Sequence, residues 1–101
     1  MHYVNHIYKI MKIEYDVDKD EVNRFKHRLS LTFGQRVFDD PYVVLTPTIR
    51  IGDEEERWKA IGLVEGKLYT AVHVLRGDIV RLISVRRSNA NERRDYDSDT
   101  S

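Results

Sequence analysis

Short links between strand-like segments constrain the fold of this chain more than any other feature of its sequence. After Pro41, apolar and β-branched residues recur with the period of two that is typical of β-strands. We expect strands at residues 42–46, 57–64, 67–75 and 79–87. A link of two or three residues joins antiparallel neighbours, so the last three strands should form two consecutive hairpins.

Two helices are predicted before this sheet. Asp18, followed three residues later by Glu21, matches a capping box at the start of a helix over residues 19–28. Three apolar residues share one face of that helix: Val22, Phe25 and Leu29. Ser30 can cap a second helix, which should end before Pro41 because proline disfavours a helical residue in front of it.

The expected fold is therefore α+β, with two N-terminal helices followed by a four-stranded antiparallel sheet and a short C-terminal helix. Asn89 and Glu92 form a second capping pair, which marks the start of that last helix. A chain of 101 residues suits a single domain, which we place at residues 11–96. Residues 1–10 are expected to be an N-terminal extension or a short strand, and residues 97–101 a disordered acidic tail.

Composition excludes several kinds of protein. The 17 basic and 17 acidic residues cancel, so the net charge does not indicate a nucleic-acid binder, although six arginines from Arg76 to Arg94 predict a basic patch. The absence of cysteine excludes disulfides, thiol nucleophiles and zinc-thiolate sites. No apolar segment is long enough to cross a bilayer, so we expect a soluble, cytoplasmic protein.

The two hairpins predict which side chains face one another. If Glu65 and Gly66 form a two-residue turn, Trp58 lies opposite His73, and a three-residue second loop would place His73 opposite Arg81. Such a row can stack on a base, move a proton and hold a phosphate. A smaller apolar row would lie beside it: Ala60, Ala71 and Ile83. A slip of one residue in the second hairpin would put Arg81 on the opposite face from His73.

The chain also carries an ordered set of charged and aromatic motifs. Its members are Asp16 with Lys19 and Asn23, Lys26-His27, Phe33, Val37-Phe38-Asp39-Asp40-Pro41, Glu55-Glu56-Arg57-Trp58, Ile61-Gly62, Val72-His73, Arg76, Arg81 with Ile83-Ser84, Arg86, and Glu92-Arg93-Arg94 with Tyr96. This set resembles the BrnT toxins of bacterial type II toxin-antitoxin systems, a branch of the RelE-like ribonuclease fold. The pattern departs at Arg28, where glycine is usual, and at Ser88, where alanine is usual.

The resemblance implies a metal-independent endoribonuclease that arrests growth and needs no cofactor. It also implies a BrnA-like antitoxin with a ribbon-helix-helix fold, which would neutralise the toxin in a heterotetramer. In that complex the antitoxin would supply the contacts with operator DNA, and RNA would be the toxin's substrate.

Metal-free RNA cleavage needs a base for the 2′-hydroxyl proton, an acid for the leaving 5′-oxygen and cations for the charge on the phosphorane. The candidate catalytic residues are Lys26, His27, Glu56, Arg57, His73, Arg81 and Arg86. The histidines can titrate near neutral pH, Glu56 can act as a base, and the lysine and arginines can hold phosphate oxygens. The candidate RNA-binding residues are Trp58, Arg76 and Arg87.

Plainer interpretations of these residues stay open. Lys26 and His27 could be a solvated helix end, favoured by the helix dipole. His73 in an apolar strand could be a buried histidine, and Trp58 could belong to the core. Arg81 needs a partner or a solvent-facing groove because burying its charge alone is costly. Arg81 and Arg86 should point to opposite faces unless a bulge intervenes.

Three functional classes fit the sequence: a ribonuclease toxin, a non-catalytic module that binds an acidic protein segment, and an inactive toxin that retains antitoxin binding. Arg28 and Ser88 are the only sequence hints of lost activity. His27 and His73 have no carboxylate at metal-site spacing, so no metal site is predicted. The glycines are scattered rather than grouped in a phosphate loop, and no nucleophile-elbow motif is present.

Overall fold

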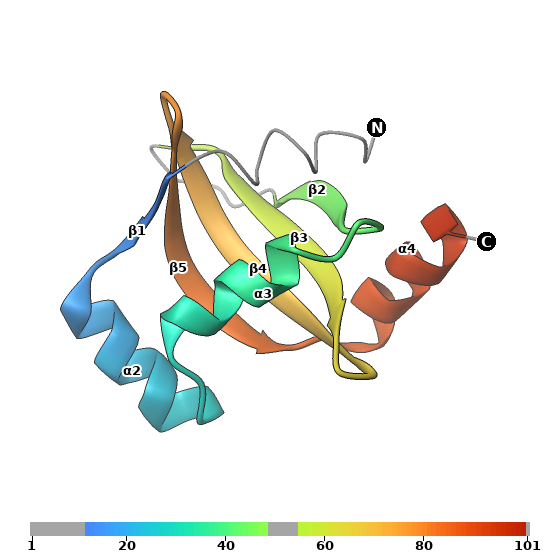
Figure 1. The fold of residues 1–101 in the computed structure, drawn as a ribbon, viewed down its shortest axis with the longest axis horizontal. Helices are drawn as coiled ribbons and strands as arrows, with labels where there is room; N and C mark the ends of the chain where they lie inside the picture. The colour runs from blue at the N-terminus through green and yellow to red at the C-terminus, as the bar shows by residue number, and fades with distance from the viewer. Residues whose placement is uncertain (1–11, 49–54, 101) are drawn as a thin grey trace.

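A twisted sheet forms the centre of the molecule, with helices packed against both of its faces (Figure 1). The computed structural model describes residues 12–48 and 55–100, so the expectation for residues 1–10 lies outside the described residues. The described elements are β1 (Lys12–Tyr15), α2 (Val17–His27), η1 (Leu31–Phe33), α3 (Gly34–Phe38), β2 (Val44–Thr48), β3 (Arg57–Val64), β4 (Lys67–Arg76), β5 (Ile79–Arg87) and α4 (Ala90–Thr100). No described helix is long and apolar enough to cross a membrane.

The prediction of a four-stranded antiparallel sheet after two N-terminal helices is wrong. The sheet has five strands in the order β1-β5-β4-β3-β2, and its edge strand β1 runs parallel to β5. A four-residue strand has too little alternation to stand out, and its partner lies far along the chain. The second helix is reduced to the 3-10 turn η1 followed by the five-residue helix α3. The last helix extends to Thr100, into the segment expected to be a disordered tail.

Helix α2 packs through polar rather than apolar side chains. Asp20 accepts a hydrogen bond from the Leu31 amide at 2.6 Å, and the Asn23 amide bridges the backbone of Val85 in β5. Only Leu29 of the predicted apolar face packs against the core, since Val22 is 52% exposed and Phe25 is 85% exposed. Fixed hydrogen bonds to neighbouring backbone therefore decide the orientation of this helix, and its apolar periodicity does not.

The first hairpin has the predicted register, with Val64 opposite Lys67 and Trp58 opposite His73. The second hairpin differs, because Gly77 with a φ of 61° supports a two-residue turn in which Arg76 pairs with Ile79. Arg81 consequently lies opposite Val74, and Leu82 lies opposite His73. The expected row of Trp58, His73 and Arg81 is therefore wrong: His73 and Arg81 lie on opposite faces of the sheet.

A β-bulge changes the register again farther along β5. Val72 pairs with Ser84 while the adjacent His73 pairs with Leu82, so Ile83 is the additional residue. The predicted row of Ala60, Ala71 and Ile83 is corrected in the same way, because Ala71 pairs with Val85. The bulge also returns Arg86 to the face that carries Arg81, where strict alternation would have separated them.

One face of the sheet is buried and we call it the buried face. Its centre is formed by Ala60, Ala71, Leu82 and Val85, which pack beneath the segment that carries η1 and α3. A Cβ added to Gly62 would lie 2.5 Å from the carbonyl oxygen of Val37. Glycine is therefore needed where α3 crosses β3.

The other face, which we call the open face, is only partly covered. Helix α4 covers one end of it, where Tyr96 packs with Val44 and Ile61. The Tyr96 hydroxyl donates to the Asp40 carboxylate at 2.6 Å, which ties α4 to the loop after α3. The rest of the open face carries a series of polar and charged side chains: Arg57, Lys59, Thr70, Arg81, Ser84 and Arg86.

Candidate functional site

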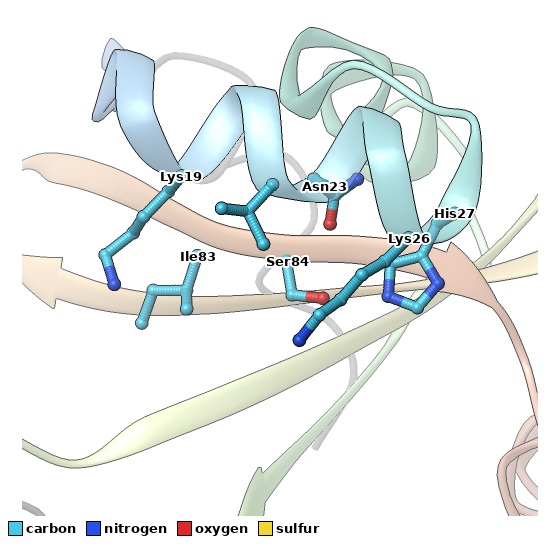
Figure 2. A pocket seen from close by; sticks show the side chains of 7 residues that line it. Lys19, Asn23, Lys26, His27, Ile83 and Ser84 are labelled. Carbon is cyan, nitrogen blue, oxygen red and sulfur yellow. The ribbon is translucent and has the colours of Figure 1, made fainter.

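Two adjoining depressions lie along β5 and together form what we call the basic groove. The first lies on the open face and is lined by Thr48, Arg57, Lys59, Val72, Ile83, Ser84 and Arg86. The second lies between α2 and β5 and is lined by Lys19, Val22, Asn23, Lys26, His27, Ile83 and Ser84 (Figure 2). Both share the bulged segment of Ile83 and Ser84, so the bulge is the point at which they meet.

The helix end that carries Lys26 and His27 borders this groove. Figure 2 shows the two side chains next to each other at the end of α2, on the side that faces Ser84 of β5. Burial lowers the pKa of His27, and the positive charges of Arg86 and Lys26 lower it further. A neutral imidazole at neutral pH is therefore favoured, and a neutral imidazole can accept a proton.

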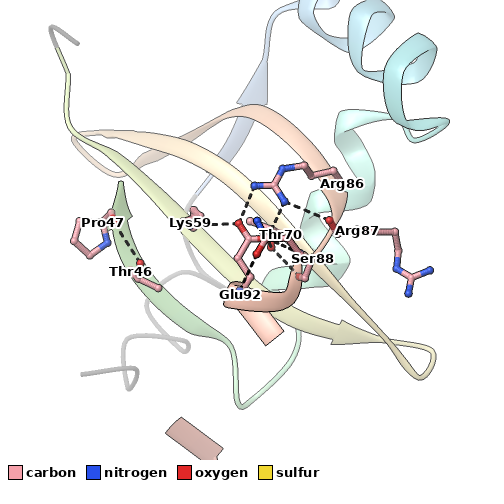
Figure 3. Close-up of polar contacts among 9 residues, drawn as sticks. Thr46, Pro47, Lys59, Thr70, Arg86, Arg87, Ser88 and Glu92 are labelled. Atoms are coloured by element: carbon pink, nitrogen blue, oxygen red, sulfur yellow. Dashed lines mark hydrogen bonds and ion pairs between the residues drawn. The ribbon is translucent and has the colours of Figure 1, made fainter. Parts of the chain in front are cut away.

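Arg86 is held at the groove by a carboxylate that was not among the candidate site residues. Its Nη1 and Nη2 each donate to Glu92 of α4 at 2.7 Å, and Lys59 approaches the same carboxylate at 3.3 Å (Figure 3). Burial would raise the pKa of Glu92, but hydrogen bonds from Arg86, the Asn89 amide and Thr70 lower it to about 2. Glu92 is thus a buried anion that links two cations of the groove.

Arg81 lies on the open face but lines neither depression. It forms an ion pair of 2.6 Å with Glu14 of β1, across the parallel edge of the sheet. The Arg81 side chain is 25% exposed, so it has the partner that its position in an apolar strand requires. The structure therefore brings Arg57 and Arg86 to the groove and places Arg81 beside the edge strand.

His73 and Trp58 lie on the buried face, away from the groove. His73 is fully buried, packs edge-on against Phe38 at 5.1 Å between ring centroids, and contacts the Ala71 carbonyl through Nδ1 at 3.2 Å. Burial lowers its pKa to about 4. Trp58 pairs with His73 on one side and Pro47 on the other. The plainer interpretation of a buried histidine matches this geometry, whereas Trp58 is only partly buried and is not part of either core cluster of the described residues.

The remaining candidates lie around the edges of the sheet. Arg76 makes two hydrogen bonds with the exposed Glu55, at 2.8 and 3.0 Å, near the β4–β5 turn. Arg87 lies over the ring of Tyr69 at 5.5 Å, at the other end of the hairpin. Glu56 is exposed immediately before β3. The structure brings none of these three into the lining of the groove.

Four residues of the groove were not among the predicted site residues, although the family motifs include all of them except Lys59: Lys19, Lys59, Ser84 and Glu92. Lys59 was accessible to sequence reasoning, because the residue two positions after Arg57 in a strand shares its face. The only physical role predicted for Glu92 was helix capping, and its bonds to Arg86 and Thr70 depend on where α4 docks. Ser84 reaches the open face through the bulge, for which the sequence has no clear signal.

The chain matches the model of the family described as the ribonuclease toxin, BrnT, of type II toxin-antitoxin systems, over residues 15–92. The chain belongs to this family. The match covers more than half of the sequence and includes α2, the whole of β2 to β5 and the start of α4. Membership implies a ribonuclease toxin with an antitoxin partner. A search of curated proteins found no match.

Proposed function

We propose that this BrnT-family chain is a metal-independent endoribonuclease whose active site is the basic groove. The observation that carries the proposal is the position of His27, a histidine with a lowered pKa, between the cations of α2 and those of the open face. RNA is a polyanion, so a groove lined by Lys26, Arg57 and Arg86 suits its backbone.

The groove can supply the parts of the reaction in the following way. His27 takes the proton of the 2′-hydroxyl as the oxygen attacks the adjacent phosphorus. Arg57 and Arg86 donate hydrogen bonds to the phosphate oxygens as negative charge develops on them. Lys26 lies beside His27 and can donate the proton that the leaving 5′-oxygen requires.

The donor set supports a reaction without a bound metal. The parts of the chain from residue 12 to 48 and from 55 to 100 contain no group of three His, Asp or Glu side chains arranged to hold a metal ion. The groove supplies its positive charge through lysine and arginine, which can stabilise the phosphorane directly. Because cellular RNA is the proposed substrate, we place the activity of the chain in the cytoplasm.

We further propose that the antitoxin has a ribbon-helix-helix fold, bridges two toxin chains in a heterotetramer and supplies the contacts with operator DNA. The exposed apolar side chains of Val17, Val22 and Phe25 on α2 support a docking surface for it. Val22 also lines the groove, so an antitoxin segment bound to α2 would lie where RNA enters the groove.

Purified chain tests the catalytic proposal. Wild-type protein should cleave RNA in the presence of a chelator, and induced expression without antitoxin should arrest growth. His27→Gln should lower kcat about 100-fold, because a positioned general base contributes roughly 100- to 10,000-fold. Activity should rise with pH, with a midpoint at more acidic pH than an ordinary histidine would give, because burial and the neighbouring cations lower the pKa of His27.

Two results would contradict this proposal. Loss of cleavage on chelation, with recovery on addition of a divalent metal, would exclude the metal-free reaction. A folded wild-type chain that binds the antitoxin but cleaves no RNA would favour a binding module or an inactive toxin. The structure gives little support to inactivity from Arg28 and Ser88, since Arg28 is an exposed helix end and Ser88 contacts Thr70 at 2.8 Å.

Phe25 tests the partner surface. Phe25→Asp should weaken antitoxin binding at least tenfold, because it places a charge on an apolar contact worth more than about 1 kcal/mol. The side chain is 85% exposed, so the variant should fold and cleave RNA as the wild type does. Unchanged antitoxin affinity in Phe25→Asp would place the docking surface elsewhere.

A further inference from the structure

We propose that Glu92 is a positioning residue of the basic groove. Its buried carboxylate binds one edge of the Arg86 guanidinium and thereby leaves the other edge available for a phosphate of RNA. The inference rests on the proposed function, because it concerns how a proposed phosphate-binding arginine is oriented. It assigns a catalytic purpose to helix α4, which otherwise only covers one end of the sheet.

The hydrogen bonds of Arg86 divide its guanidinium into an occupied and an available edge. Both Nη atoms donate to Glu92, and Nη1 also approaches the Arg87 carbonyl at 3.3 Å. Nε and the second hydrogen of Nη2 donate to none of the described residues. These two N–H groups point along the same edge, and such a parallel pair matches two oxygens of one phosphate.

Glu92 is itself held rigidly. Its side chain is fully buried and accepts hydrogen bonds from Thr70 of β4 at 2.9 Å and from the Asn89 amide at 2.9 Å. Lys59 of β3 approaches it at 3.3 Å. A carboxylate fixed from two strands and a helix leaves Arg86 little freedom, so the arginine does not have to be ordered when a substrate binds.

A capping role alone does not account for this arrangement. Glu92 and Asn89 exchange the two hydrogen bonds of a capping box, which involves the Asn89 amide, its side chain and one carboxylate oxygen. The second oxygen, Oε2, takes no part in the cap and accepts only from Arg86 and Lys59 among the described contacts. A glutamine could cap the helix equally well, but it could not accept both arms of the Arg86 fork.

Glu92→Gln separates these roles. It keeps the cap and loses the charge, so kcat for RNA cleavage should fall about 10- to 100-fold with a smaller change in KM. Affinity for an uncleavable 2′-O-methyl RNA should fall about tenfold, the size expected for a misdirected charge-assisted hydrogen bond. Tyr96→Phe is the matched control: it weakens the other anchor of α4 without touching Arg86, and its kcat should stay near the wild-type value.

A double-mutant cycle identifies the route of the effect. In an Arg86→Lys background, Glu92→Gln should cause little further loss, because lysine has no fork to orient. Additive losses would show that Glu92 acts on something other than Arg86. If Glu92→Gln does not fold, Glu92→Asp keeps the charge and withdraws the carboxylate by one methylene, and wild-type kcat in that variant would overturn the proposal.

The outcomes distinguish this inference from the proposed function. A wild-type chain that cleaves RNA, together with a folded Glu92→Gln that matches it in kcat and in RNA affinity, refutes the positioning role alone. Equal losses in Glu92→Gln and Tyr96→Phe would reduce Glu92 to an anchor of α4. A wild-type chain without cleavage refutes the nuclease, and lower RNA affinity in Glu92→Gln would then still support positioning of Arg86 for phosphate.

Discussion

The buried and open faces of the sheet are built from alternate residues of the same strands, yet they treat polar groups in opposite ways. On the buried face, His73 is fully enclosed and its pKa is lowered to about 4, so it remains uncharged. On the open face, Arg86 keeps its charge because the Glu92 carboxylate accompanies it. The comparison shows that the buried face accommodates a polar side chain in its uncharged form, whereas the open face keeps a charged side chain by pairing it with an opposite charge.

The two histidines make the same contrast at single-residue scale. Burial lowers the pKa of both, but His27 lies at a helix end that lines the groove and His73 lies under α3. A lowered pKa therefore indicates a site only when the group can also be reached by a substrate. The comparison predicts that open-face changes alter activity and buried-face changes alter stability.

The largest expected effect is on the open face. Arg57→Ala should lower kcat for RNA cleavage about 100- to 1,000-fold, the loss typical of one group that stabilises transition-state charge. Its melting temperature should stay close to that of the wild type. Arg36→Ala is a matched control, since Arg36 pairs with the exposed Glu65 outside the groove. Equal activity in the two variants would break the distinction between the faces.

The next effect concerns His73 and the buried face. Its pKa is lower in the folded than in the unfolded chain, so the unfolded chain takes up the proton first as the pH falls. The free energy of unfolding is therefore not reduced by His73 above pH 6.5, and it falls by about 3 kcal/mol as the pH is lowered to 4. Chemical denaturation at several pH values measures this dependence.

His73→Gln is the variant that isolates this contribution. It should remove most of the change in stability between pH 6.5 and 4, leaving the smaller part that comes from the lowered pKa of His27, while the folded protein still cleaves RNA at pH 7. Glu92, whose pKa of about 2 makes its contribution disappear only as the pH falls through that value, should contribute to the pH dependence that remains below pH 4.5, together with Asp20, whose pKa is also lowered. Loss of cleavage in folded His73→Gln would mean that the buried face takes part in the reaction.

Gly62 tests how closely the buried face is packed. Gly62→Ala would place a Cβ 2.5 Å from the Val37 carbonyl oxygen, so the free energy of unfolding should fall by about 1–3 kcal/mol. A Cβ added at Gly66 has no neighbouring atom within 4 Å, so in Gly66→Ala the free energy of unfolding should fall only by the smaller cost of a side chain at positive φ. Equal losses in the two variants, measured by urea denaturation, would show that α3 can shift away from β3.

The smallest effect concerns Arg28, at the end of α2. Its φ of 60° lies in the left-handed region, which glycine adopts without the penalty of a Cβ. Arg28→Gly should therefore raise the free energy of unfolding by about 0.5–1 kcal/mol, whereas Glu21→Gly inside the same helix should lower it by about 1 kcal/mol. A loss of stability in Arg28→Gly would show that the arginine side chain makes a contribution larger than its strain.

Local patterns predicted the elements whose causes are local. Alternating residues and short links gave β3, β4 and β5 to within one residue at each end, and the Asn89–Glu92 pair marked the start of α4. The apolar spacing of Val22 and Phe25 misled, because α2 is oriented by the bonds of Asp20 and Asn23 to residues outside it. Amphipathic periodicity reports burial only when the helix packs through that face.

The residues that line the basic groove were only partly predictable from the sequence. Basic residues and histidine indicated a phosphate ligand, and Lys26, His27, Arg57 and Arg86 line the groove. The register of β5 was not predictable. Its turn has one residue fewer than expected and its bulge adds one residue, and each of these changes moves side chains from one face of the sheet to the other. Glu92 was hidden for a related reason: its partners are set by tertiary docking.

The parallel pairing of β1 with β5 also determines when the sheet can be completed during synthesis. Glu14 meets Arg81 across 67 positions of sequence, so the N-terminal strand has no partner until nearly the whole chain has left the ribosome. The carboxylate that pairs with Arg86 comes later still, at position 92. An incomplete nascent chain therefore lacks both the parallel edge of its sheet and the ion pair between Arg86 and Glu92.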